Sequence, residues 1–351
     1  MATLIQQPQQ LCFSSSLADI VFGTNAGSGR LVMTLTHNGS SMNILDETYY
    51  ADSGGTVTLY DLSSLLEPYA RQYLEVVVNC SFTDSAGTAS VSPVTVLFAM
   101  ADVDMPAATF VNTHFLSILN GEKMTAMGRE ERLYMYGTGT VTVSAYIQMA
   151  SGEFVTSADE LSPIQTTGNI RQYDVSPSEV ESVLGLVGGK ILSYAVECGQ
   201  RSQRFVMTED SVPPAPSLLF TNSFGCQEFI HCVGTHKKDS KYDRQSTRIH
   251  GKLRNYRITE NRQFVANTGW LNEAMADWAD ELFRSEEVYL WVDDTVGRQV
   301  VISESKSEIT NDDDNMPAFE FTYGYAQRIH NVLQPSHAGR IFDNTFDATF
   351  N

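Results

Sequence analysis

The sequence predicts a mainly β protein, with tandem β-sandwich domains followed by an α+β C-terminal domain that has one amphipathic helix and an extended C-terminal arm. Three observations predict this architecture. Segments rich in Val, Thr, Leu and Tyr alternate in polarity with period two and are separated by Gly and Asn turns. A short pattern of residues occurs twice in the same order. Near residue 278, apolar residues recur at helical spacing instead.

The length and composition indicate a multidomain globular protein. The chain has 351 residues, of which 42% are hydrophobic and 19% charged, and this length corresponds to about two or three domains. Its 23 Lys and Arg against 42 Asp and Glu give a net charge of −19, which disfavours nucleic-acid or anionic-membrane binding. We expect no membrane insertion, because no apolar run of about 18 residues is present. The first 13 residues lack signal-peptide features, so we expect synthesis in the cytoplasm.

The first predicted domain covers residues 15–105. Residues 31–37, 55–60, 73–82 and 91–98 have the alternating pattern of strands, and turns such as Asn38-Gly39 separate them. Strands this short with turns this frequent are typical of an antiparallel β-sandwich.

The repeated pattern predicts a second, related β-sandwich domain at residues 106–211. Tyr60-Asp61 and Tyr173-Asp174 are each followed by a Ser-x-x-Glu capping box, so one short helical turn is expected between strands in each copy. A strand follows in each copy, about five residues later in the second. The matching positions are Leu74, Val76, Val78 and Cys80 in the first copy and Leu192, Tyr194, Val196 and Cys198 in the second. Relatedness and chance similarity both remain open, and the cysteines are expected to be buried core residues.

The third predicted domain, residues 217–351, follows a Pro-rich linker at residues 212–216. Helical spacing predicts an amphipathic helix over residues 269–284, which should bury Trp270, Met275, Trp278 and Leu282 against a sheet. The strands expected in this domain cover residues 217–221, 226–233, 256–264, 288–292, 299–303 and 318–325.

No motif predicts catalysis, and we expect neither an enzyme nor a cofactor. Cys226, His231, Cys232 and His236 have zinc-ligand chemistry, but Cys226 and Cys232 would lie about 20 Å apart on a strand. The acidic residues 311–315 could hold calcium, although an acidic hairpin loop is the simpler interpretation and the EF-hand spacing is absent. The glycine-rich residues 23–30 lack the Gly-Lys-Ser/Thr ending of a phosphate-binding loop.

The strongest charge anomaly is the basic segment, residues 236–262. It has nine Lys and Arg against three acidic residues, a net +6, so the rest of the chain carries −25. We expect a long exposed loop running into a strand that contacts an acidic neighbouring subunit; a solvated loop or nucleic-acid binding are the alternatives. The interface candidates in this segment are Lys237, Lys238, Lys241, Arg244, Arg248, Lys252 and Arg254.

The C-terminal arm is the second interface candidate. It repeats Phe-Asp-x-Thr and places Phe342, Phe346 and Phe350 four residues apart. Such Phe side chains would be an aggregation liability if exposed. They therefore either fold back on their own domain or dock on a neighbouring subunit.

Three stretches of the third domain carry a resemblance. Residues 220–228, 262–271 (RQFVANTGWL) and 340–351 (RIFDNTFDATFN) resemble poorly characterised tail-associated structural proteins of phages and prophages of gut Bacteroidales. The resemblance covers about 130 residues and implies a virion structural protein of the tail, distal tail or baseplate. Its implied partners are itself, as a ring or other homo-oligomer, and other tail proteins. A β-sandwich adhesin or glycan-binding tail protein is the alternative, and a tail-associated glycan hydrolase is a third.

Overall fold

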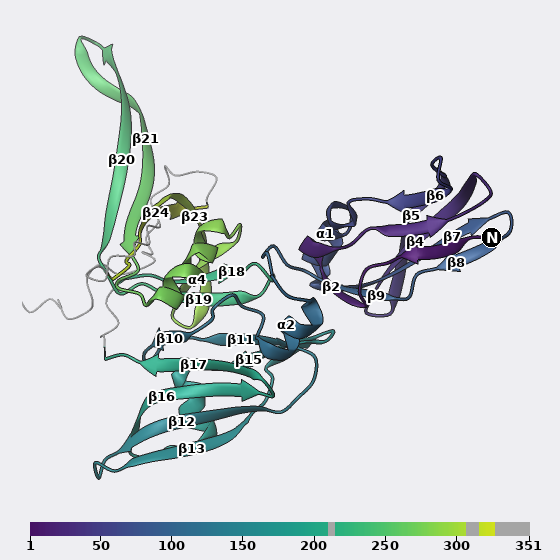
Figure 1. Ribbon diagram of the computed structural model, residues 1–351. Helices are drawn as coiled ribbons and strands as arrows, with labels where there is room; N and C mark the ends of the chain where they lie inside the picture. Colours follow the sequence, from purple (N-terminus) through teal and green to yellow (C-terminus); the bar gives the residue numbers. More distant parts are fainter. Residues whose placement is uncertain (210–214, 307–315, 327–351) are drawn as a thin grey trace, which may run out of the picture.

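The computed structural model describes residues 1–209, 215–306 and 316–326, arranged as three β-rich units (Figure 1). Strands account for 54% of the structure and helices for 13%, and the strands form several sheets. The expected mainly β class is confirmed. No helix among the described residues is long and apolar enough to cross a membrane.

The first unit consists of two sheets that share one hydrophobic core. Their strand orders are β1-β3-β6 and β2-β9-β7-β4-β5, with β8 paired to β7. Phe22 and Phe82 stack between the sheets with 5.5 Å between ring centroids. The elements are β1 (Thr3–Gln6), β2 (Leu11–Phe13), η1 (Ser14–Ser16), β3 (Ile20–Gly23), β4 (Ser28–His37), β5 (Ser40–Tyr50), β6 (Thr56–Leu59), α1 (Leu62–Tyr73), β7 (Glu75–Asp84), β8 (Gly87–Ser90) and β9 (Val94–Leu97).

The second unit also has two sheets around a shared core. Their orders are β10-β17-β16-β12-β13 and β11-β15-β14. The elements are α2 (Ala107–Thr113), β10 (Glu122–Thr125), β11 (Arg132–Tyr136), β12 (Val141–Met149), β13 (Phe154–Leu161), β14 (Gln165–Thr167), β15 (Ile170–Asp174), α3 (Pro177–Val183), β16 (Gly189–Cys198) and β17 (Arg201–Met207).

The larger sheets of these two units have the same connectivity. In each, the first strand of the sheet along the chain pairs in parallel with the last strand, as β2 does with β9 and β10 with β17. The strand that follows the helix, β7 or β16, lies in the middle of the sheet next to β4 or β12. The repeat in the sequence therefore coincides with a repeat of strand order.

The two helix starts differ from the expected capping boxes. Asp61, not Ser64, caps α1: it lies in the left-handed region and accepts a 2.9 Å hydrogen bond from the Ser64 hydroxyl. Ser176 is the N-cap of α3, but its hydroxyl donates to Asp174 at 2.6 Å rather than accepting from the helix. In both copies an Asp carboxylate two or three residues upstream is the stronger acceptor, so neither capping box forms.

Most of the expected strand face is buried. Cys80 and Cys198 are buried, as the pattern predicted. Leu74 is an exception, because it ends α1 with φ 62° before the strand starts. Leu192 is the other, because a β-bulge beside Tyr146 skips it and the neighbouring Ile191 takes the core position.

The third unit is a seven-stranded antiparallel sheet with the order β19-β18-β22-β23-β24-β21-β20. Helix α4 shares a hydrophobic cluster with residues of this sheet. The elements are β18 (Ser217–Thr221), β19 (Gln227–His231), β20 (His236–Ile249), β21 (Lys252–Asn267), α4 (Glu273–Arg284), β22 (Val288–Val292), β23 (Thr295–Lys306) and β24 (Glu320–Tyr325).

Helix α4 covers residues 273–284 of the predicted range 269–284. Met275, Trp278 and Leu282 are buried as expected, but Trp270 is 71% exposed. The helix begins after Asn272, whose side chain caps it by accepting from the Met275 amide at 2.8 Å. Trp270 therefore precedes the helix and is not on its apolar face.

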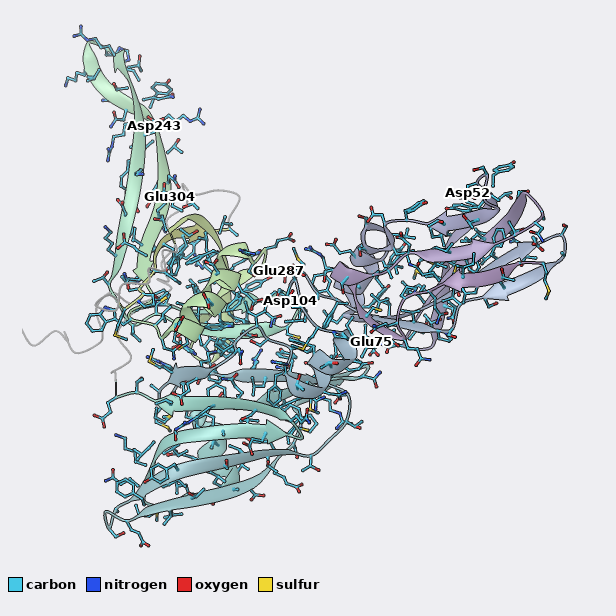
Figure 2. The ribbon with its side chains drawn as sticks, in the orientation of Figure 1. Asp52, Glu75, Asp104, Asp243, Glu287 and Glu304 are labelled. Carbon is cyan, nitrogen blue, oxygen red and sulfur yellow. The ribbon has the colours of Figure 1, made fainter. Side chains whose placement is uncertain are left out.

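A small aromatic cluster joins the three units. Phe13 of the first unit, Phe110 of α2 and Phe224 of the third unit lie with ring centroids 5.1–5.7 Å apart. Close to it, the buried Glu75 side chain, labelled in Figure 2, accepts hydrogen bonds from Asn169 of the second unit. Through these contacts each of the three units touches the other two.

Candidate subunit interface

The basic segment forms a long β-hairpin rather than the expected loop. Strands β20 and β21 pair antiparallel from His236–Ala266 at the base to Ile249–Lys252 at the tip. His250 and Gly251 both have positive φ, 50° and 76°, as a two-residue type I′ turn requires. The strand expected at residues 256–264 is part of β21, but residues 236–249 and 252–255 are also strands and not the expected loop. These residues carry no continuous apolar face, and such a face is the usual sequence signal for a strand.

Within the residues that the structure describes, only the base of this hairpin is joined to the rest of the sheet. Strand β24 pairs with β21 over residues 263–267. At the base, the His236 ring bonds the Tyr323 hydroxyl at 2.9 Å, and Phe264 stacks on Tyr323. Beyond this point the ribbon projects away from the body (Figure 1).

A carboxylate neutralises part of the charge near the base. Glu260 accepts two hydrogen bonds from the Arg262 guanidinium, at 2.9 and 2.8 Å, and lies 3.9 Å from the Lys238 ammonium. The Arg262 hydrogen bonds lower the pKa of Glu260, and Glu260 in turn raises the pKa of Arg262. The charges of these three side chains are therefore paired within the chain.

The outer part of the ribbon combines cations with exposed apolar side chains. Asp243, labelled in Figure 2, is its last acidic residue before the tip. Leu253 is 69% exposed, and Tyr256 and Ile258 are also exposed. The Arg244 guanidinium lies 5.1 Å from the centre of the Tyr242 ring, a cation–π arrangement. Tyr and Arg are both enriched at protein interfaces relative to the rest of the surface.

The seven basic interface candidates all lie on this hairpin and are distributed along it from the base to the tip. They are Lys237, Lys238, Lys241, Arg244, Arg248, Lys252 and Arg254. The three Phe candidates, Phe342, Phe346 and Phe350, lie outside the described residues, as do the acidic residues 311–315 and most of the linker. What the sequence analysis missed is the apolar component; the spacing of Ile249, Leu253 and Ile258 among the charges was the available signal.

A second feature absent from the sequence analysis is a buried polar network between the second and third units. Lys123 Nζ lies 2.6 Å from the Glu131 carboxylate and 4.4 Å from the Trp278 ring centre. The Trp278 indole donates to Glu228, which also accepts from Asn222 at 2.6 Å. These groups lie inside the protein, so the network holds the two units together rather than facing a substrate.

The zinc-like residues are not arranged as a metal site. Cys226 and Cys232 are buried free thiols at opposite ends of β19, and burial raises the pKa of both. His231 bonds the Ser217 hydroxyl and the Glu130 carbonyl. Within residues 1–209, 215–306 and 316–326, no group of three or more His, Cys, Asp or Glu side chains could hold a metal ion.

Comparisons with known proteins leave the family open. No family model and no curated protein matches the chain. Among solved structures, the chain is similar to the Group B Streptococcus pullulanase SAP at 14% identity, with a TM-score of 0.20. The match covers 66% of this chain but only 26% of the pullulanase. A superposition this poor carries no argument about fold or function.

Proposed function

We propose that this protein is a structural subunit that assembles with copies of itself, as a component of a phage tail, distal tail or baseplate. The observation that carries the proposal is the β20–β21 hairpin, which extends from the body with its apolar and cationic side chains exposed. A two-stranded ribbon is at best marginally stable alone in water. A neighbouring subunit would give it a surface to pack against.

The fold supports the same proposal. We interpret residues 15–105 and 106–211 as two related β-sandwich domains, because their larger sheets share one strand order. Residues 217–351 then form an α+β assembly domain that carries the hairpin and the C-terminal arm. Tandem sandwiches in contact through a shared aromatic cluster suit a structural role, where subunits contact each other over large surfaces.

The tail assignment rests on the resemblance of residues 220–228, 262–271 and 340–351 to tail-associated proteins of Bacteroidales phages. In this role the protein is made in the host cytoplasm, is incorporated into the virion, and acts without a cofactor or catalysis. Its partners are further copies of itself and other tail proteins.

Two measurements test the proposal. Sedimentation velocity of the purified chain should show a species several times the 38.9 kDa monomer mass. Mass spectrometry of purified virions from a host carrying the prophage should detect the protein among tail components. A monomer at all concentrations, or absence from virions, would contradict the proposal.

One observation favours the alternative of a glycan-binding tail protein. Tyr146 and Phe154 stack on β12 and β13 with 5.6 Å between ring centroids, and both are half-exposed. Exposed aromatic rings on a rigid sheet can serve as a platform for sugar rings. A glycan array with the wild-type protein and a Tyr146→Ala variant distinguishes this function, because binding that depends on Tyr146 would support it.

A further inference from the structure

The hairpin has two halves with different charge. In the base half, Glu260 pairs with Arg262 and Lys238, and Asp239 and Asp243 add two more carboxylates. In the distal half, residues 244–258, five cations occur without any carboxylate. They are Arg244, Arg248, Lys252, Arg254 and Arg257. The distal half therefore carries +5 out of the hairpin's net +6.

The distal half also lacks a packing partner in the part of its own chain that the structure describes. Strand β24 reaches only to residue 263 of β21, so among the described residues the distal strands pair only with each other. Yet this stretch presents Ile249, Leu253 and Ile258 to solvent. Covering an exposed Leu or Ile removes apolar surface from water, so a second surface would stabilise the ribbon.

A β-bulge adds an aromatic side chain to the same region. The register shifts between Gln245 and Ser246, which leaves Tyr256 as the extra residue of β21. Its hydroxyl donates to the Gln245 side chain at 2.8 Å, which fixes the ring on the ribbon while most of it stays exposed. Tyr and Arg are the residue types that most often carry binding energy at protein interfaces.

Charge identifies the partner. Because the chain outside the basic segment carries −25, the body of another copy attracts a +5 ribbon, whereas it repels nucleic acid. The exposed Leu and Ile also fit a protein surface better than a phosphate backbone. We propose that the distal half of the hairpin, residues 244–258, docks on an acidic face of a second copy of this chain. This inference rests on the proposed function, because it requires self-assembly.

Matched charge reversals in the full chain test the proposal. The distal variant carries Arg248→Glu and Arg254→Glu; the control carries Lys237→Glu and Lys241→Glu, the same charge change on the base half. Self-association is measured by sedimentation velocity across a concentration series. We expect the distal variant to raise the dissociation constant about 100-fold, since each lost charge contact is worth about tenfold, and the control to raise it less than about threefold. Equal effects would overturn the proposal.

A Leu253→Ser variant tests the apolar part. It should weaken association about tenfold, and the loss should persist at about 0.5 M NaCl, where charge contacts are screened. Val296→Ser, an exposed residue on β23, is the control and should have no effect. An unchanged dissociation constant for Leu253→Ser would contradict an apolar contact at the tip.

The outcomes separate the two proposals. If the wild-type chain stays monomeric, self-assembly fails and this inference fails with it. If the wild type assembles and the distal variants assemble equally well, only this inference is overturned. Fluorescence anisotropy with a labelled DNA duplex of about 30 bp at about 0.15 M salt tests whether the hairpin binds nucleic acid instead. Tight binding lost on distal charge reversal would replace the second copy with nucleic acid.

Discussion

Lys123 and Glu131 form a buried ion pair, with 2.6 Å between the ammonium nitrogen and the carboxylate oxygen. The same ammonium donates at 2.8 Å to the carbonyl oxygen of Phe229, in strand β19 of the third unit. Lys123 and Glu131 belong to the second unit, so the Lys123 ammonium binds groups of both the second and the third unit. The contact between these two units, called the joint below, therefore depends on the Lys123 side chain.

Lys123→Met should destabilise the protein by about 3–5 kcal/mol, because removing one partner leaves the Glu131 carboxylate buried without its countercharge. Chemical denaturation at pH 7 measures the loss. The double variant Lys123→Met and Glu131→Leu is the control, and it should recover at least half of the lost stability. A double variant no more stable than the single would show that the ion pair is not the cause.

The buried carboxylates predict an unusual pH dependence. Burial and the neighbouring Glu228 raise the pKa of Glu281 to about 7, so its contribution favours folding at low pH and is lost as pH rises through about 7. Between about pH 5 and 7 this group contributes a slope of up to about 1.4 kcal/mol per pH unit. Glu281→Gln keeps the acceptor for Ser223 and should remove that slope.

The pH dependence of stability that arises from His231 has the opposite sign to that from Glu281. The wild type must therefore be compared with the Glu281→Gln variant. Burial lowers the pKa of His231 to about 3, so its contribution to stability falls as pH drops below about 6.5. The wild-type pH profile contains both contributions. Subtracting the Glu281→Gln profile, measured by denaturation from pH 5 to 8, removes the His231 contribution and leaves the contribution of Glu281 together with its effect on Glu228. A difference that does not change with pH would contradict the raised pKa.

The sequence predicted those strands and helices whose own residues alternate between buried and exposed positions. Strands β4, β6 and β7 and helix α4 follow directly from periodicity, because one face of each is buried against the core. Trp270 was wrongly assigned to the helix because the helical spacing of apolar residues extends to two residues before the Asn272 cap. The bulge at Leu192 depends on pairing with β12, and a strand pattern does not reveal its partner's register.

The sequence predicted which basic residues make up the candidate interface, but not that they lie on a β-hairpin. The basic residues of segment 236–262 were identified by charge, yet the ribbon was not, because neither of its faces is apolar along most of its length. The network around Lys123 could not be found at all. Its contact with Phe229 spans 106 residues, and only the fold brings the two units together.

Trp278 and Trp270 provide a paired test of burial around α4. Trp278 is fully buried and contacts Phe220 and Lys123, whereas Trp270 is exposed. Trp278→Ala should cost about 3–5 kcal/mol of unfolding free energy, and Trp270→Ala should change it by less than about 0.5 kcal/mol. Denaturant titration followed by circular dichroism measures both. A loss under about 1 kcal/mol for Trp278→Ala would mean that the joint is not packed as described.

The five thiols should be inert in the native protein. All five cysteines are free and buried, and burial raises the pKa of Cys80 and Cys232 to about 12. A thiolate is the reactive form, so both access and ionisation are suppressed. Ellman's reagent at pH 8 should therefore modify almost none of the thiols in native buffer and all five in guanidinium chloride. Rapid native reaction of even one would show an opening of its core.

Removing the distal half of the hairpin should separate assembly from folding. Asp243 and Thr259 face each other across the ribbon, so residues 244–258 can be replaced by Asn-Gly, a two-residue turn that closes a hairpin with the native twist. The base pairings with β24 and the contact of His236 with Tyr323 stay intact. The truncated chain should melt within about 2 °C of the wild type, because within the described residues the deleted strands pair only with each other.

The same variant should lose self-association. Sedimentation velocity should give a monomer at concentrations where the wild type is assembled, because both the +5 charge and the exposed apolar residues of the ribbon are gone. The control inserts the Asn-Gly turn in place of His250-Gly251, which keeps the ribbon and should leave assembly unchanged. If the truncated chain assembles as well as the control, the subunit contact lies elsewhere. If it unfolds instead, the distal half stabilises its own body, and the ribbon is not a free docking element.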